Sequence, residues 1–288
     1  MTVSLTIITV TFSPGRYLER FLDSIPGAYA GTPRVILADN GSTDGAPERA
    51  AAEREGVEFL PTGGNLGYGA AINRAAEAAD ADSEFLLIVN PDVQFNPGSI
   101  DALLDCARRH PEAGAIGPVI REPDGSAYPS ARSVPTLGTG IGHALLAGVW
   151  QDNPWTKRYR DDADMTHERA AGWLSGSCLL VRRSAFEELG GFDERYFMYL
   201  EDVDFGDRLG RHGWSNILCP RAEITHAQGH AADEAPRAML AAHHESAYRF
   251  QADRHPRWWH APIRGLLKAG LAARLALAYR LSTKRKGK

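Results

Sequence analysis

Short apolar runs alternate with segments of helical periodicity along residues 1–120 of the chain. The apolar runs predict strands at residues 4–12, 34–39, 57–60, 85–89 and 115–120. The helical pattern predicts helices at residues 16–24, 47–55, 68–79 and 99–109. This alternation is typical of an α/β domain in which helices flank a mostly parallel, Rossmann-like sheet.

The pattern weakens over residues 121–169, and a stretch of this length is usually a functional or mobile loop. Regular elements then return. We expect a strand at 171–181, a short helix opened by a capping box of Ser184 and Glu187, a helix at 201–212 and a strand at 222–225.

Residues 256–288 form a basic tail. They contain nine Lys or Arg residues and no Asp or Glu, so the other 23 basic and 36 acidic residues leave the body at −13. Trp258 and Trp259 precede leucines at helical spacing, and a basic amphipathic helix with interfacial Trp favours an anionic membrane surface. The alternative is a helix docked on the domain. We expect one domain at 1–229 and a C-terminal helical, membrane-associating extension at 230–288.

The composition is that of a soluble globular protein, with 43% hydrophobic and 24% charged residues. The net charge of −4 gives no reason to expect a nucleic acid partner. Cys106, Cys178 and Cys219 are far apart in the sequence, which favours reduced thiols in the cytoplasm. The chain also has no apolar run of about 18 residues that predicts a spanning helix.

Polar turns follow three of the predicted strands, at Thr11, at Asp39-Asn40-Gly41-Ser42 and at Asn90-Pro91-Asp92. In an open parallel sheet, ligands bind at the carboxyl ends of the strands. Turn-forming residues explain any one of these segments, but three on one edge favour a binding site. The glycines at 63–69 precede a helix that could present N–H groups to a phosphate, although alone they are weak support.

Two acidic motifs compete for the role of a metal site. Asp202 and Asp204 stand two apart in a predicted helix, where their carboxylates diverge, so Asp92 with Asn90 is the better metal candidate. His226 could complete that site. Asp202, in the cluster at 201–204, is then the candidate proton acceptor, although complementarity to the helix dipole is an alternative explanation of the cluster.

Together these motifs resemble glycosyltransferase family 2, the inverting enzymes of the GT-A fold, and within it the bacterial rhamnosyltransferases. The similarity covers about residues 3–230. The residues that carry it are Thr9-Val10-Thr11-Phe12, Asp39-Asn40-Gly41-Ser42-Thr43-Asp44-Gly45, Asn65-Leu66-Gly67-Tyr68-Gly69 with Asn73, Asn90-Pro91-Asp92, Gly172-Trp173-Leu174-Ser175-Gly176, Gly191-Phe192-Asp193-Glu194 and Phe197-Met198-Tyr199-Leu200-Glu201-Asp202-Val203-Asp204.

The resemblance, together with the Ala- and Arg-rich composition and residues 131–135, implies a particular reaction. It implies an actinobacterial enzyme that moves L-rhamnose from dTDP-rhamnose to polyprenyl-diphosphate-linked GlcNAc, in the linker between arabinogalactan and peptidoglycan. Mg²⁺ or Mn²⁺ would be the cofactor, and the protein would lie peripherally on the inner face of the cell membrane. Asn90 departs from the usual two-aspartate metal motif and leaves a single anionic ligand, Asp92.

The resemblance also implies roles for individual residues. Asp202 would be catalytic, and Asp92 and His226 would bind the metal. Trp173, Ser175 and Glu201 would bind the acceptor. The donor would be bound by Thr11, Asp39, Asn40, Ser42, Asp44, Asn65, Gly67, Asn73 and Asn90.

Three other functions stay open. One is a family 2 transferase that uses a different nucleotide sugar for exopolysaccharide or O-antigen synthesis. Another is a non-catalytic, membrane-docked nucleotide-sugar-binding protein. The third is a sugar nucleotidyltransferase, which would need a basic, Gly-rich loop that Ser13-Pro14-Gly15 does not supply.

Overall fold

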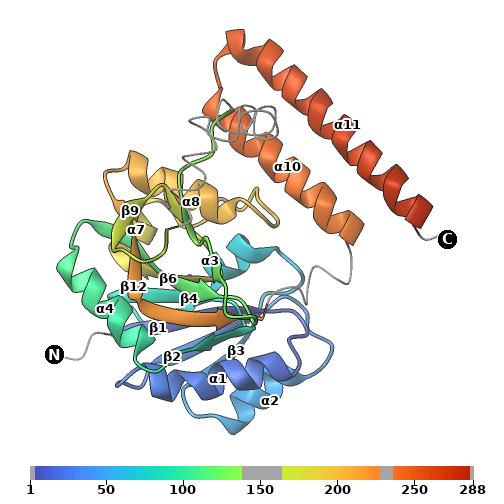
Figure 1. Ribbon diagram of the computed structural model, residues 1–288. Coiled ribbons are helices and arrows are strands. Elements are labelled where there is room, and N and C mark those ends of the chain that lie inside the picture. Colours follow the sequence, from blue (N-terminus) through green and yellow to red (C-terminus); the bar gives the residue numbers. More distant parts are fainter. Residues whose placement is uncertain (1–3, 138–163, 228–235, 286–288) are drawn as a thin grey trace.

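The computed structural model of the chain describes residues 4–137, 164–227 and 236–285. Its centre is one large twisted sheet (Figure 1). In spatial order the strands of its main path are β3 (Val57–Pro61), β2 (Arg34–Asp39), β1 (Leu5–Thr11), β4 (Phe85–Val89), β11 (Cys178–Arg182), β6 (Ala113–Arg121), β12 (Ser215–His226) and β5 (Val93–Phe95).

The first half of the sheet is parallel, as the sequence pattern predicts. Strands β3, β2, β1 and β4 all run in the same direction, and β6 and β12 are also parallel to each other. Between these two groups lies β11, which is antiparallel to both β4 and β6. The carboxyl ends of β1, β2 and β4 therefore meet at one edge, together with the start of β11.

Helices cover both faces of the sheet, which explains why its central strands are apolar throughout. Neighbouring residues such as Ile7 and Ile8 point to opposite faces, and both are fully buried. One face packs against α1 (Arg16–Ala28), α2 (Ala46–Glu53) and α4 (Ser99–Arg109). The other face packs against α3 (Tyr68–Ala78), α7 (Arg183–Glu188) and α8 (Glu201–Arg211).

The predicted strand at 171–181 is wrong as a single element. The chain forms β9 (Arg169–Ala171), which pairs with β12, and then β10 (Trp173–Leu174), which pairs with β8 (Ala131–Arg132) in a separate small sheet. It turns back into the main sheet only at β11. The nearby β7 (Ala127–Tyr128) pairs with β6. Residues 138–163 of the predicted loop lie outside the described part of the chain.

The predicted capping box is also wrong. Helix α7 begins at Arg183 with Arg182 as its N-cap, and no side chain caps it. The Arg183 side chain instead donates to Glu187 at 2.7 Å, which occupies the carboxylate that the capping box requires.

The C-terminal region is helical, as expected, and consists of α10 (Pro236–Arg254), a 3₁₀ turn at Trp258–His260 and α11 (Ala261–Arg285). Figure 1 shows α10 and α11 side by side as a hairpin above the sheet. Helix α10 packs on the body, where Ser246 Oγ donates to the Met198 carbonyl at 2.9 Å and Phe250 is buried with Tyr196. The expected boundary at 229/230 falls outside the described residues, so the division into two domains stays a prediction.

The loop before α3 is held against the segment before α8 by a close backbone contact. A Cβ at Gly67 would lie 2.3 Å from the Phe197 carbonyl oxygen, and Gly67 has a φ of 88°. The same carbonyl accepts a hydrogen bond from Tyr68 N–H at 3.0 Å. Only glycine meets both conditions, because any side chain would push the two segments apart.

We therefore expect Gly67→Ala to lower the free energy of unfolding by more than Gly63→Ala does. Gly63 has a similar φ of 91° but nothing within 4 Å of its added Cβ, so it isolates the cost of backbone conformation, about 1–2 kcal/mol, from that of the clash. Urea denaturation of both variants measures the difference. Equal losses would mean that the contact with Phe197 contributes nothing.

Candidate active site

Asp39 organises the polar turn at the end of β2. Its Oδ1 accepts a hydrogen bond from Thr11 Oγ1 at 2.8 Å and another from the Ser42 hydroxyl. Its Oδ2 accepts the backbone N–H groups of Gly41 at 3.0 Å and Ser42 at 2.9 Å. The carboxylate is 95% buried, and these four donors offset the loss of water. Thr11, Asp39 and Ser42 thus form one rigid unit at the predicted edge.

Two further polar residues join this turn to neighbouring loops. Asn40 donates to the Gly67 carbonyl at 3.1 Å and accepts from Thr62 at 2.9 Å, while Asn65 accepts from Gly67 N–H at 3.2 Å. Asp44 accepts Gly15 N–H at 2.7 Å, which links the loop after β2 to the loop after β1. The edge therefore consists of loops that are tied together by side chains.

Some of the residues predicted to bind substrate form hydrogen bonds to other segments of the protein. Asn73 donates to the Phe192 carbonyl at 2.9 Å and accepts from Phe192 N–H at 2.8 Å, so it fastens α3 to the turn at 191–194. Trp173 donates its indole N–H to the Ser133 carbonyl at 3.2 Å. Ser175 contacts the Ser177 hydroxyl at 3.2 Å. The roles of Asn73 in donor binding and of Trp173 and Ser175 in acceptor binding stay predictions.

Asp92 and His226 lie together, although 134 residues separate them. Strand β5 follows Asp92 and pairs with β12 so that Val93 is opposite His226. The pairing places His226 Nε2 at 3.0 Å from Asp92 Oδ1 and 3.4 Å from Asn90 Nδ2. His226 therefore lies beside Asp92, and the role of both residues in metal binding stays a prediction.

Asp202 lies in the first turn of α8 and is held by backbone N–H groups. Gly176 donates to its Oδ2 at 2.9 Å and Val203 to its Oδ1 at 2.8 Å. Burial raises the pKa of Asp202, and these two N–H groups partly offset that rise. A carboxylate whose pKa is raised and whose orientation is fixed by N–H groups suits the acceptance of a proton.

Glu201 is 92% buried beside Asp202, and its Oε2 has no hydrogen-bond partner among the described residues. Burial, with the negative charge of Asp202 as the next cause, raises the pKa of Glu201 to about 8. Burial thus raises the pKa of both adjacent carboxyl groups, and Glu201 is mostly protonated at neutral pH.

Tyr68 and the two residues before α8 also belong to this site, although sequence reasoning did not single them out. The Tyr68 hydroxyl donates to the Gly176 carbonyl at 2.7 Å, and burial and the charges of Glu201 and Asp202 raise its pKa well above its usual value. Tyr199 and Leu200 have φ values of 68° and 62°. Such conformations are costly outside glycine and concentrate at functional sites. All three residues stand within motifs that carry the family resemblance, but sequence reasoning assigned a role to none of them.

Comparisons with known proteins agree with this geometry. Residues 6–190 match the family model described as Glycosyl transferase family 2. An N-acetylglucosaminyl-diphospho-decaprenol L-rhamnosyltransferase of Mycobacterium tuberculosis is 54% identical, over 99% of this chain and 96% of that protein. The rhamnosyltransferase WbbL of Escherichia coli is 25% identical, over 78% of this chain and 83% of that protein.

Solved structures share the fold at low sequence identity. The mannosyltransferase PcManGT from Pyrobaculum calidifontis, in complex with GDP-Man and Mn²⁺, aligns with a TM-score of 0.59 and 20% identity, over 99% of this chain and 80% of that chain. GalNAc-T7 with UDP, GalNAc and Mn²⁺ aligns with a TM-score of 0.59 and 15% identity, over 78% of this chain and 44% of that chain. These similarities confirm the GT-A fold. The family match and the full-length relative together make the chain a member of glycosyltransferase family 2.

Proposed function

We propose that this glycosyltransferase moves L-rhamnose from dTDP-rhamnose to the GlcNAc of a polyprenyl-diphosphate acceptor, with inversion at the anomeric carbon. The observation that carries the transfer chemistry is the partly buried Asp202 carboxylate, anchored by Gly176 and Val203 beside a polar strand edge. The choice of sugar and acceptor rests on the 54% identical mycobacterial relative.

In this proposal Asp202 is the general base. It takes the proton of the acceptor hydroxyl while that oxygen forms a bond to the anomeric carbon and the bond to the diphosphate breaks. The N–H groups on both carboxylate oxygens fix the orientation of Asp202 before substrate binds. Neutral Glu201 avoids a second negative charge next to the base, and its buried Oε2 has no hydrogen-bond partner among the described residues.

The nucleotide would bind along the loops that Asp39 organises, with Thr11, Asn40, Ser42, Asp44, Asn65 and Gly67 shaping the pocket and Asn90 at its inner end. Trp173 and Ser175 would lie on the acceptor side. The support is placement, because these residues follow β1, β2 and β4 at one edge or come from the turn that contacts Asp202.

The donor set of Asp92 and His226 fits a divalent cation, with Asn90 beside it presenting its Nδ2 to His226 at 3.4 Å. One carboxylate and one imidazole suit Mn²⁺ better than Mg²⁺, which prefers oxygen ligands alone. Asp92 and His226 already lie within 3.0 Å of each other, so two ligands converge on one place. When bound, the cation would neutralise the charge of the departing diphosphate.

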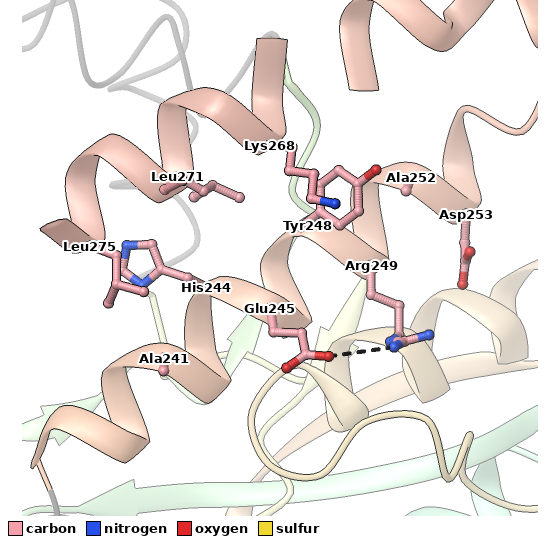
Figure 2. A pocket seen from close by; sticks show the side chains of 11 residues that line it. Ala241, His244, Glu245, Tyr248, Arg249, Ala252, Asp253, Lys268, Leu271 and Leu275 are labelled. Carbon is pink, nitrogen blue, oxygen red and sulfur yellow. Dashed lines mark ion pairs between the residues drawn. The ribbon is translucent and has the colours of Figure 1, made fainter. Parts of the chain in front are cut away.

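We also propose that α11 and the turn before it meet the cytoplasmic face of an anionic membrane. None of the described helices is long and apolar enough to cross a bilayer. Figure 2 shows Leu271 and Leu275 of α11 lining the groove against α10, opposite Tyr248. Leu271 and Leu275 therefore contribute to the packing of α11 against α10.

A different set of apolar residues faces solvent. Trp258 is 81% exposed, Leu266 79%, Trp259 51% and Ile263 44%. These four residues, which we call the Trp258 patch, stand in a tail that has no acidic residue. Exposed Trp and Leu next to Lys and Arg are the combination that anionic lipid surfaces bind.

The function is tested by incubating the protein with dTDP-rhamnose, UDP-GlcNAc, UDP-galactose or GDP-mannose, with and without polyprenyl-diphosphate-GlcNAc. We expect consumption of dTDP-rhamnose alone, and only when the lipid acceptor is present. Consumption of another donor would indicate a different family 2 activity. Binding without turnover of any donor would indicate a non-catalytic protein.

Asp202→Asn should reduce kcat by about 10²–10⁴-fold, since it removes the proton acceptor but keeps the size of the side chain. Glu201→Gln is the matched control, because it replaces a carboxyl that is already mostly neutral with an amide of similar shape. We expect its loss at pH 7 to be much smaller. Steady-state kinetics on both variants decides, and comparable losses would contradict the assignment of the base to Asp202 alone.

Asp92→Ala should weaken binding of dTDP and make it insensitive to Mn²⁺, because the remaining Asn90 and His226 are neutral ligands. Asp82→Ala, at an exposed aspartate in the turn before β4, is the control and should keep the metal effect. Calorimetry with and without Mn²⁺ measures both. An unchanged enhancement by Mn²⁺ in Asp92→Ala would place the metal elsewhere.

Replacing Trp258, Trp259 and Leu266 together with Ala should lower binding to anionic vesicles by at least about tenfold, since burial of apolar area contributes roughly 25 cal/mol per Å². High salt should weaken binding of the intact protein, because each Lys or Arg near the surface contributes about 1 kcal/mol of screened attraction. Sedimentation with anionic and neutral vesicles measures both effects. The replaced side chains are exposed, so thermal stability should not change. Undiminished binding by the triple variant would exclude the Trp258 patch as the anchor.

A further inference from the structure

A group of metal-ligand side chains lies away from the transferase site, at the end of α4. Cys106 and His110 are four residues apart, so both project from one side of the helix. Glu168 approaches them from the residue before β9. The ligand atoms of these three residues all lie within 4.8 Å of one another. Glu168 Oε1 is 2.8 Å from His110 Nε2, and Glu168 Oε2 is 3.6 Å from Cys106 Sγ.

A second thiol stands beside the first. Cys219 lies on β12, one residue after Leu218, which pairs with Arg169 of β9, so Cys219 is next to Glu168 in the sheet. Cys106 and Cys219 are both fully buried. The side chains of Cys106 and Cys219 interact with each other.

We propose that this cluster is a Zn²⁺ site, with Cys106, His110 and Glu168 as its protein ligands. Thiolate, imidazole and carboxylate are the ligands of zinc in proteins, at about 2.0–2.3 Å from the ion. Ligand atoms on one tetrahedral ion then lie roughly 3–4 Å apart. The separations of 2.8 and 3.6 Å are close to that spacing without movement of the backbone.

The ordinary alternative is a cluster of ion pairs. Arg109 contacts Glu168 Oε2 at 2.5 Å, and Glu112 contacts His110 Nδ1 at 3.0 Å. Glu168, and then Glu112, raises the pKa of His110. Both partners can persist beside an ion. A metal on His110 Nε2 and Glu168 Oε1 replaces their mutual contact and leaves Arg109 on the other oxygen and Glu112 on the other nitrogen.

Such an ion would join the end of α4 to the start of β9, because His110 and Glu168 are 58 residues apart in the sequence. Glu168 precedes Arg169, which pairs with Leu218 of β12, whereas Asp92 contacts His226 at the end of that strand. The site is therefore separate from the transferase centre, and the proposal does not depend on the proposed function.

The test uses the full chain with Asp92→Ala, which removes the other candidate metal site. The apoprotein is titrated with Zn²⁺ and, separately, with Co²⁺, whose thiolate charge-transfer absorption reports sulfur ligands directly. We expect one tightly bound ion per chain and a clear thiolate band. Cys106→Ser should abolish the band, and His110→Ala and Glu168→Gln should weaken binding at least about tenfold, the usual lower limit for loss of a group at a metal site.

Cys178→Ala is the matched control, since it removes a third buried thiol that lies on β11, apart from the cluster. It should leave binding and the band unchanged. His110 and Glu168 are partly exposed, so their variants should fold even if Cys106→Ser does not. Absence of a tightly bound ion, a Co²⁺ complex without the thiolate band, or binding that survives His110→Ala and Glu168→Gln would overturn the proposal and leave an ion-pair cluster.

Discussion

The carboxylate of Asp202 is partly buried, and a charge that loses water must be hydrogen-bonded to be stable. Two backbone N–H groups meet this requirement, one from Gly176 and one from Val203. Gly176 belongs to the turn before β11, and a Cβ there would lie 3.3 Å from the Cβ of Asp202. The segment before β11 and the start of α8 therefore have to lie in direct contact.

A third segment completes this arrangement. Tyr68 donates to the carbonyl of the same Gly176, and its own N–H donates to Phe197 O. The loop at 63–69, the turn at 175–177 and the segment at 197–203 thus hold each other in place. The strain of Tyr199 and Leu200 is offset by these contacts, which over-determine the backbone before Asp202.

Sequence reasoning succeeded where local pattern and strand position decide the structure. Apolar runs located the parallel strands, and the polar turns after β1, β2 and β4 meet at one edge because parallel strands end together. Asp92 and His226 were grouped for the same reason. The sequence could not reveal that β11 inserts antiparallel between β4 and β6, because this depends on pairing partners far away in the chain. Residues 171–181 look like one apolar strand, and only the close contacts at Gly172 and Gly176 interrupt it.

In the C-terminal tail, too, the sequence predicted an element but not its packing partner. Leucines at helical spacing predicted the helix correctly, but not which of them face a partner. Because α10 lies alongside, Leu271 and Leu275 line the hairpin, while Leu266 and the two Trp residues stay exposed. The apolar stripe thus divides between two surfaces, and only the exposed part is available to a membrane.

Helix α10 links α11, which carries part of the exposed Trp258 patch, to the segment before Asp202, the proposed base. Its Ser246 holds the Met198 carbonyl, its His243 ring lies 5.6 Å from the ring of Tyr199, and its Arg254 pairs with Asp207 of α8. All three contacts fall on the segment that places Asp202. A protein that binds lipid through α11 would therefore hold its base at a fixed position relative to the membrane. An acceptor whose sugar is tied to a lipid needs such an arrangement, because its reactive hydroxyl cannot leave the surface.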